Sequence, residues 1–339
     1  MDNDSNKIVK DSLMGLIELG PKEGFERPSV PRGDNIFPPK QPVDLVDDIS
    51  MISVIDEIIS STKNKEVYSW CCLILNRLLK NTKYCEISFF LIDKIKQETE
   101  LWKLKKLVSP IAVWNPCTNK VSELVYLLEH KNNEIRHGII NALKDCTDPN
   151  IEEPLLGVLN NSKNAHEIYF TLLSLRNVAT KKSLDSLYPL LTHKKQDVKI
   201  SSLSVISKIL KSEGSDFFIN LLSNKTFRDK DIVTLYIRNY CKEKGVSPIC
   251  NRIKSILSRK RGRPLIFRRD DRSEATELIL NTEFLSKYYD SHPEVERTFQ
   301  LIEKKWDNVF DSEKEEIENI IVDSRVKSKS HNKLLHRTS

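Results

Sequence analysis

Hydrophobic residues recur at every third or fourth position along most of the chain, which is the spacing of one face of an amphipathic α-helix. The pattern begins at Val43 and continues through amphipathic runs over residues 67–79 and 87–107. Between residues 121 and 250 the pattern also repeats, with a period of about 30 to 34 residues. The aligned segments begin at Asn133, His166, Gln196 and Lys230. Two short helices in such a period predict an α-solenoid, in which each helix pair buries its apolar face by stacking on its neighbours.

The repeated segments resemble HEAT or HEAT-like repeats. Leu127 and Leu128 precede a polar turn, Ile135-Arg136 follows it, and Ala142-Leu143 comes one helix length later. The family pattern is a Leu pair, an acidic turn, Val-Arg and Ala-Leu. The resemblance implies an all-α fold, an α-α superhelix of HEAT-like repeats whose second helices line an inner surface. It implies no particular activity.

The hydrophobic pattern and the composition divide the chain into five segments. Residues 1–42 hold six of the 14 prolines and four of the nine glycines, which predicts an irregular, extended segment. The sequence predicts a Pro/Gly-rich N-terminal arm over 1–42, HEAT-like repeats over 43–257, a basic loop over 258–272, a C-terminal helical cap over 273–324 and a basic disordered tail over 325–339.

The charge of the chain is unevenly placed, although its formal sum is only +6. Residues 252–272 carry nine basic side chains against two acidic ones, and residues 325–339 carry basic residues and no acidic ones. The remainder is therefore mildly acidic. This distribution directs attention to the two basic segments when an anionic partner is considered.

Motifs that carry catalysis or bind cofactors are absent. The sequence has no Gly-x-x-x-x-Gly-Lys or Gly-x-Gly-x-x-Gly loop, no His-Glu-x-x-His and no Gly-x-Ser-x-Gly. Cysteine and histidine show no zinc-ligand spacing. We therefore expect no enzyme activity, no metal and no small-molecule cofactor.

The chain also lacks the signals of membrane and secreted proteins. No apolar run approaches the 18 or more residues of a spanning helix, and the first residues are polar and acidic. The seven cysteines, several of them within apolar helical pattern, favour reduced and buried thiols. We expect a cytoplasmic protein with no membrane partner.

The HEAT-like resemblance also identifies candidate binding residues on the second helices. They form a polar to basic series without acidic residues, with one aromatic residue beside them. The candidates are His137, Asn141, Lys144, Tyr169, Ser174, Asn177, Ser204, Lys208, Arg238 and Lys242. A groove for an acidic peptide or a phosphate backbone and an ordinary solvated helix face both fit this series.

The basic loop contains a short segment with more specific chemistry. Residues 261–264 read Arg-Gly-Arg-Pro, which resembles the core of the AT-hook, a motif that inserts arginine into the narrow minor groove of A/T-rich DNA. The apolar residues 265–267 depart from that motif and are expected to dock on the solenoid. The nucleic-acid candidates are Arg259, Lys260, Arg261, Gly262, Arg263, Arg268 and Arg269. A structural basic loop is the alternative.

Three functions remain open at this point. The leading one is a non-enzymatic scaffold that binds a protein partner along its concave face. The first alternative is a solenoid that binds nucleic acid through residues 252–272. The second is an enzyme similar to the DNA glycosylases built on HEAT-like repeats, for which Tyr169 and Phe170 are present but no acidic partner is evident.

Overall fold

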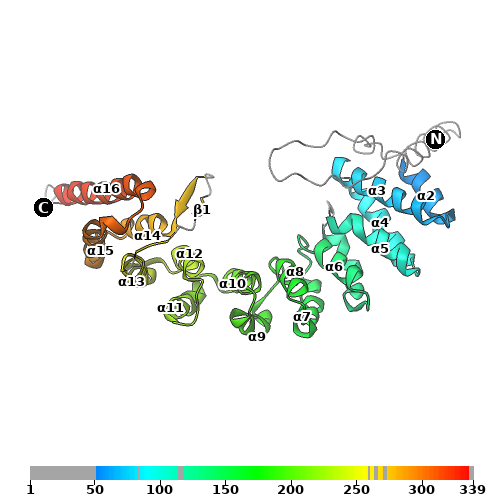
Figure 1. The fold of residues 1–339 in the computed structure, drawn as a ribbon, viewed down its shortest axis with the longest axis horizontal. Helices are drawn as coiled ribbons and strands as arrows, with labels where there is room; N and C mark the ends of the chain where they lie inside the picture. The colour runs from blue at the N-terminus through cyan, green and yellow to red at the C-terminus, as the bar shows by residue number, and fades with distance from the viewer. Residues whose placement is uncertain are drawn as a thin grey trace. The chain divides into compact units, whose positions relative to one another are not determined.

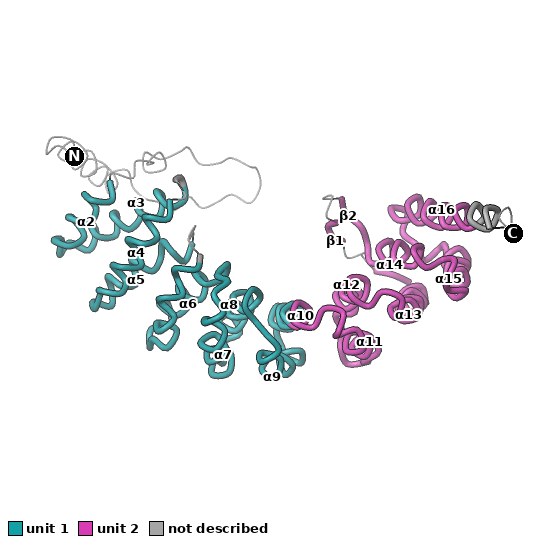
Figure 2. Tube along the Cα trace, turned by 180° about the vertical axis from the view of Figure 1, so that it is seen from behind, with its two compact units in different colours: residues 1–205 teal, residues 206–339 magenta. Residues whose placement is uncertain are grey.

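The computed structural model describes residues 51–82, 84–113, 118–258, 260–262, 266–269 and 273–335. The side chains of 81–82, 118 and 329–335 are not part of this description. The predicted arm over 1–42 lies outside it. The chain divides into two compact units, residues 1–205 and 206–339, with the boundary inside one helix (Figure 2).

Unit 1 consists, in its described residues, of successive helix pairs (Figure 1). The pairs are α2 (Met51–Ser61) with α3 (Lys65–Thr82), α4 (Cys85–Gln97) with α5 (Leu101–Val113), the 3-10 helix η2 (Thr118–Glu129) with α6 (Asn133–Ala142), α7 (Glu152–Asn161) with α8 (Ala165–Leu175), and α9 (Leu184–Leu187) plus η5 (Tyr188–Thr192) with α10 (Gln196–Leu210). Short 3-10 turns η3 (Pro149–Ile151) and η4 (Lys181–Ser183) precede α7 and α9.

The helices of unit 1 stack in two layers. The second helices α3, α5, α6 and α8 pack on one another in chain order, and the first helices α4, η2, α7 and α9 do the same. Polar contacts join neighbouring repeats within each layer. Lys105 Nζ lies 2.9 Å from Glu134 Oε1 between α5 and α6, and the Ser174 hydroxyl donates to the Ile140 carbonyl at 2.8 Å between α8 and α6. Stacking of this kind is what the repeat period predicts.

The turns inside the helix pairs use a recurrent device. The Asn132 amide donates to His130 Nδ1 at 3.0 Å, and the Asn132 side chain accepts the amides that begin α6. One repeat later the Asn164 amide donates to the Ser162 hydroxyl at 3.2 Å, and Asn164 caps α8 in the same way. Because an Asn cap satisfies amides that have no partner inside the helix, it fixes where each second helix begins.

Unit 2 continues the pattern with further pairs. They are α11 (Ser215–Ser223) with α12 (Lys230–Tyr240), α13 (Val246–Leu257) with α14 (Glu277–Ser286), and α15 (Pro293–Lys304) with α16 (Asp311–Leu335). The 3-10 turns η6 (Lys211–Gly214), η7 (Lys242–Gly245) and η8 (Trp306–Asn308) join them. Helices α12, α14 and α16 pack in chain order, as do α13 and α15. The chain is therefore an all-α solenoid.

The basic loop differs from the prediction, because it is an insertion within a repeat. Helix α13 packs against α14 across this segment, and α13 and α14 then stack on α15 and α16 in the manner of the other repeats. The described part of the insertion contains a small antiparallel hairpin of β1 (Ile266–Arg268) and β2 (Glu274–Thr276). The residues predicted as a separate cap thus continue the solenoid.

The C-terminal tail also differs from the prediction. Helix α16 runs to Leu335, through most of the segment that was expected to be disordered. Arg325 anchors it to α15, with Nη2 2.9 Å from Glu296 Oε1 and Nη1 2.7 Å from Glu303 Oε1. The pattern of charges alone did not reveal these partners, which lie 29 and 22 residues earlier in the chain.

The cysteines mostly confirm their prediction. Cys71, Cys72, Cys146, Cys241 and Cys250 are free thiols in the apolar core. The prediction is wrong for Cys85, which is disulfide-bonded and lies half-buried at the start of α4, away from the apolar interior.

Two kinds of feature are absent from the described residues. None of the helices in this part of the chain has both the length and the apolar character needed to span a membrane. The same residues contain no group of three or more His, Cys, Asp or Glu side chains arranged to hold a metal ion.

Candidate functional site

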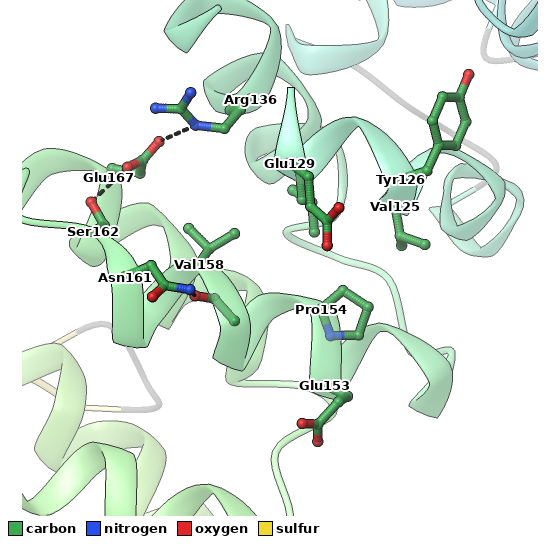
Figure 3. A pocket seen from close by; sticks show the side chains of 12 residues that line it. Val125, Tyr126, Glu129, Arg136, Glu153, Pro154, Val158, Asn161, Ser162 and Glu167 are labelled. Atoms are coloured by element: carbon green, nitrogen blue, oxygen red, sulfur yellow. Dashed lines mark hydrogen bonds and ion pairs between the residues drawn. The ribbon is translucent and has the colours of Figure 1, made fainter. Parts of the chain in front are cut away.

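A cavity of about 670 Å³ lies between η2 and α7 in unit 1 (Figure 3). Val125 of η2 and Pro154 and Val158 of α7 supply its apolar walls. Tyr126 stands at its rim with 53% of its surface exposed, which is unusual for an aromatic side chain of this size. The cavity therefore offers apolar contact together with a polar aromatic edge.

One end of the cavity is closed by a buried ion pair. Glu167 is only 5% exposed, and its carboxylate accepts from Arg136 Nε at 3.0 Å and from the Ser162 hydroxyl at 2.5 Å. Arg136 also donates to the His130 carbonyl at 2.8 Å. Burial alone would raise the pKa of Glu167, but the hydrogen bonds and the positive charge of Arg136 outweigh it and hold the pKa below its usual value. This end of the cavity is rigid and electrically compensated.

The lowered pKa of Glu167 predicts how unit 1 responds to acid. A depressed folded-state pKa contributes stability that is present above the unfolded-state value of about 4.3 and is lost as the pH falls through the folded-state value. We expect Glu167→Gln to be less sensitive to acid than the wild type when urea unfolding is compared at pH 7 and pH 3. Equal losses of unfolding free energy in the two proteins would contradict the assignment.

Gly157 lies in the interior of α7 and lines the cavity. A Cβ atom built there would meet nothing within 4 Å, and the residue is exposed. Glycine inside a helix costs about 0.5 to 1 kcal/mol relative to alanine. Close packing does not require glycine at this position. At Gly138 it does, because a Cβ there would lie 2.3 Å from Val108 Cγ1. A large side chain at position 157 would have room to enter the cavity.

Two carboxylates of the cavity have no partner among the described residues. Glu129, the last residue of η2, and Glu153, in the first turn of α7, are both exposed and make no hydrogen bond or ion pair there. Figure 3 shows Glu129 directed toward the space between the two helices. With Glu167 and Arg136 cancelling each other, the cavity has a net negative charge.

The candidate residues on the second helices of unit 1 do not form an open ladder. His137 is half-buried, with Nε2 3.3 Å from Glu167 Oε1. Lys144 and Asn177 are exposed, and the Asn177 amide donates to the Lys144 carbonyl at 3.0 Å. Ser174 was predicted at the exposed edge, but it is fully buried because its hydroxyl bonds the neighbouring helix. Asn141 and Ser204 are half-exposed.

An aromatic group lies beside His137. The ring of His166 is 5.9 Å from that of His137 and 4.5 Å from that of Phe170, and Phe170 meets Tyr169 edge-on at 5.2 Å. The acidic neighbour that a glycosylase would need is Glu167, which the sequence analysis did not identify. Its carboxylate is buried and bound to Arg136, so it is not presented to a base beside these rings.

The remaining candidates lie in unit 2. Lys208 and Lys242 are exposed. Arg238, predicted at an open edge, lies instead between α12 and α14, where Nη1 donates to Asn281 Oδ1 at 2.6 Å. Burial lowers its pKa to about 10, because nearby carboxylates only partly offset the loss of solvent.

Two arginines of the basic insertion are bound to acidic side chains. Arg261 pairs with the fully buried Glu313, with Nη2 2.7 Å from Oε1, and its guanidinium lies 4.3 Å from the centre of the Phe310 ring. Arg269 pairs with Glu283 at 2.8 Å and also with Glu316. These contacts oppose insertion of Arg261 into DNA, so the AT-hook resemblance gains no support.

The other members of that group divide in two. Lys260, Gly262 and Arg268 are exposed. Arg259 and Arg263 lie outside the described residues.

Comparison with known proteins adds little to this geometry. No protein-family model and no curated protein sequence matches the chain. Among solved structures, the chain is similar to the complex of CpcE and CpcF of phycocyanin lyase from Nostoc sp. PCC7120, with 13% sequence identity over 82% of this chain and 100% of that chain and a TM-score of 0.39. A similarity of this size carries no argument about function. Function must therefore be argued from the site itself.

Proposed function

We propose that the chain is a non-enzymatic scaffold that binds a protein partner, and that the cavity between η2 and α7 receives part of that partner. This differs from the sequence prediction in the surface used. The predicted surface was the inner face of the second helices, whereas the cavity lies between two first helices.

The observation that carries the proposal is Gly157. An exposed glycine inside a helix makes that helix less stable than alanine would. At Gly157 no neighbouring atom is close enough to exclude a Cβ. Gly157 lines the space between Val158 and Pro154 on one helix and Val125 on the other. Concave apolar surfaces with a few polar groups are the usual form of binding sites.

The contacts at the closed end support binding rather than catalysis. Glu167, Arg136 and Ser162 bind one another, so none of these three side chains is free to act as a nucleophile or general base. Their compensated network instead gives the cavity a rigid wall, which lowers the entropic cost of ordering a bound segment.

Gly157 offers a matched pair of variants for the test. Gly157→Ala should stabilise α7 by about 0.5 to 1 kcal/mol and leave the cavity open. Gly157→Trp is expected to place a large side chain in the cavity, since a Cβ at this position meets open space.

We expect a protein captured from a lysate by the wild-type chain to be retained by Gly157→Ala and lost with Gly157→Trp. Mass spectrometry of the three eluates measures this, with circular dichroism as the control for folding. Capture of the same proteins by all three chains would contradict the proposed site.

A further inference from the structure

We infer that the segment bound in the cavity carries a basic side chain, Lys or Arg, whose charged end lies against Glu129, with Glu153 adding to the negative charge of the same cavity. This inference rests on the proposed function and names the chemistry of the partner at the same site.

The position of Glu129 is the first reason. It is the last residue of η2, where the carbonyl end of the helix disfavours a negative charge. No cation among the described residues pairs with it. A negative charge held at an unfavourable helix end and directed into a cavity is explained by a cation that arrives with the partner.

The second reason is that two cations near the cavity, Arg136 and Lys96, are already bound to other carboxylates. Arg136 is committed to Glu167, with Nε 3.0 Å from Oε1. Lys96, whose charge acts on the Tyr126 hydroxyl, has its Nζ 2.7 Å from Glu123 Oε2. Neither neutralises Glu129 or Glu153. The cavity is therefore a negative site on a chain whose formal net charge is +6.

The third reason is the shape of a basic side chain. Lys and Arg have an apolar stem and a charged end, so they can lie along apolar walls while the charge reaches polar groups. Val125, Val158 and Pro154 would contact the stem, and Tyr126 borders the same cavity. An acidic segment would place a like charge beside the two carboxylates. A purely apolar segment would leave them without a countercharge.

The test uses a library of random dodecapeptides displayed on phage, selected on the full-length chain and depleted on Gly157→Trp. Enriched peptides are then synthesised, and their affinities are measured by fluorescence anisotropy for the wild type and for Glu129→Gln/Glu153→Gln. We expect enrichment of Lys and Arg, and a loss of affinity of about tenfold in the double variant, since two partly screened ion pairs are removed. Raising the salt concentration should weaken binding to the wild type more than binding to the double variant.

The remaining outcomes separate the two proposals. Peptides that lose binding with Gly157→Trp but lack basic residues, and bind the double variant as well as the wild type, would overturn this inference and leave the proposed function standing. If depletion on Gly157→Trp removes every peptide that binds the wild type, the proposed function is overturned, and this inference with it.

Discussion

Replacing Arg261 by alanine is expected to destabilise unit 2 by about 3 to 5 kcal/mol, the cost of breaking a buried ion pair by removing one partner. Glu313 is fully buried, and its carboxylate accepts from Arg261, from the Thr276 hydroxyl and from the Phe310 amide at 3.0 Å. Without Arg261 that charge would remain in the interior with no cation beside it. Hydrogen exchange of α14 and α16 in the full chain measures the effect.

Lys260→Ala is the matched control for this experiment. Lys260 is the adjacent residue and is exposed, so its replacement should change stability by no more than about 0.5 kcal/mol. Unchanged protection of α14 and α16 in Arg261→Ala would show that the ion pair does not anchor the insertion. Arg261 would then be available for an anionic ligand.

The second large effect is expected at Glu152, whose replacement by alanine should cost about 2 to 4 kcal/mol because buried donors would lose a charged acceptor. Glu152 is 8% exposed at the start of α7. Its carboxylate accepts from the Thr180 amide at 2.7 Å and from the Ser183 hydroxyl at 2.7 Å, and so joins α7 to the next repeat. Burial would raise its pKa, but these hydrogen bonds lower it overall.

Glu153→Ala controls for helix propensity and charge at the same helix end. Glu153 is exposed and has no described partner, so we expect its replacement to change stability by no more than about 1 kcal/mol, the value of an acidic residue in a first helical turn. Urea unfolding monitored by circular dichroism compares the two variants. Equal destabilisation by both would mean that the hydrogen bonds of Glu152 contribute nothing beyond its charge.

Much of the repeat architecture could be predicted because its signals are local. The sequence alignment placed Ile135, Ile168 and Val198 at equivalent positions, and all three are buried. In the fourth repeat Ile237 is fully buried, as the aligned Ile140 and Leu203 are, but the aligned Ile232 is only half-buried and its neighbour Val233 is buried instead. Where two apolar residues are adjacent, hydrophobic periodicity cannot show which of them faces the core.

Boundaries that depend on distant contacts were harder to predict. The pattern Ser312 to Glu315 suggests a capping box, yet α16 begins at Asp311, and it is the Glu313 carboxylate that accepts the Phe310 amide. The reason is Arg261, which is 52 residues earlier in the chain and holds Glu313 in the interior. Local patterns cannot contain a partner at that separation.

The candidate site could not be predicted, because it depends on a side chain that is missing between two helices. In the sequence, Gly157 is an isolated glycine within a helical pattern, and no other signal indicates that a binding site lies there. That α7 faces η2 there, and that Glu129 and Glu153 border one cavity, follows from the stacking of repeats rather than from either segment alone.

Photo-crosslinking tests the central claim most directly, because it distinguishes the cavity from the second-helix face. A p-azidophenylalanine replaces Tyr126, whose exposed ring it resembles, or Asn177, which is exposed on the second-helix side. If a partner enters the cavity, the captured protein should form a covalent product from position 126, and Gly157→Trp should abolish that product. A product from position 177 with none from position 126 would contradict the account and return the binding site to the face of the second helices.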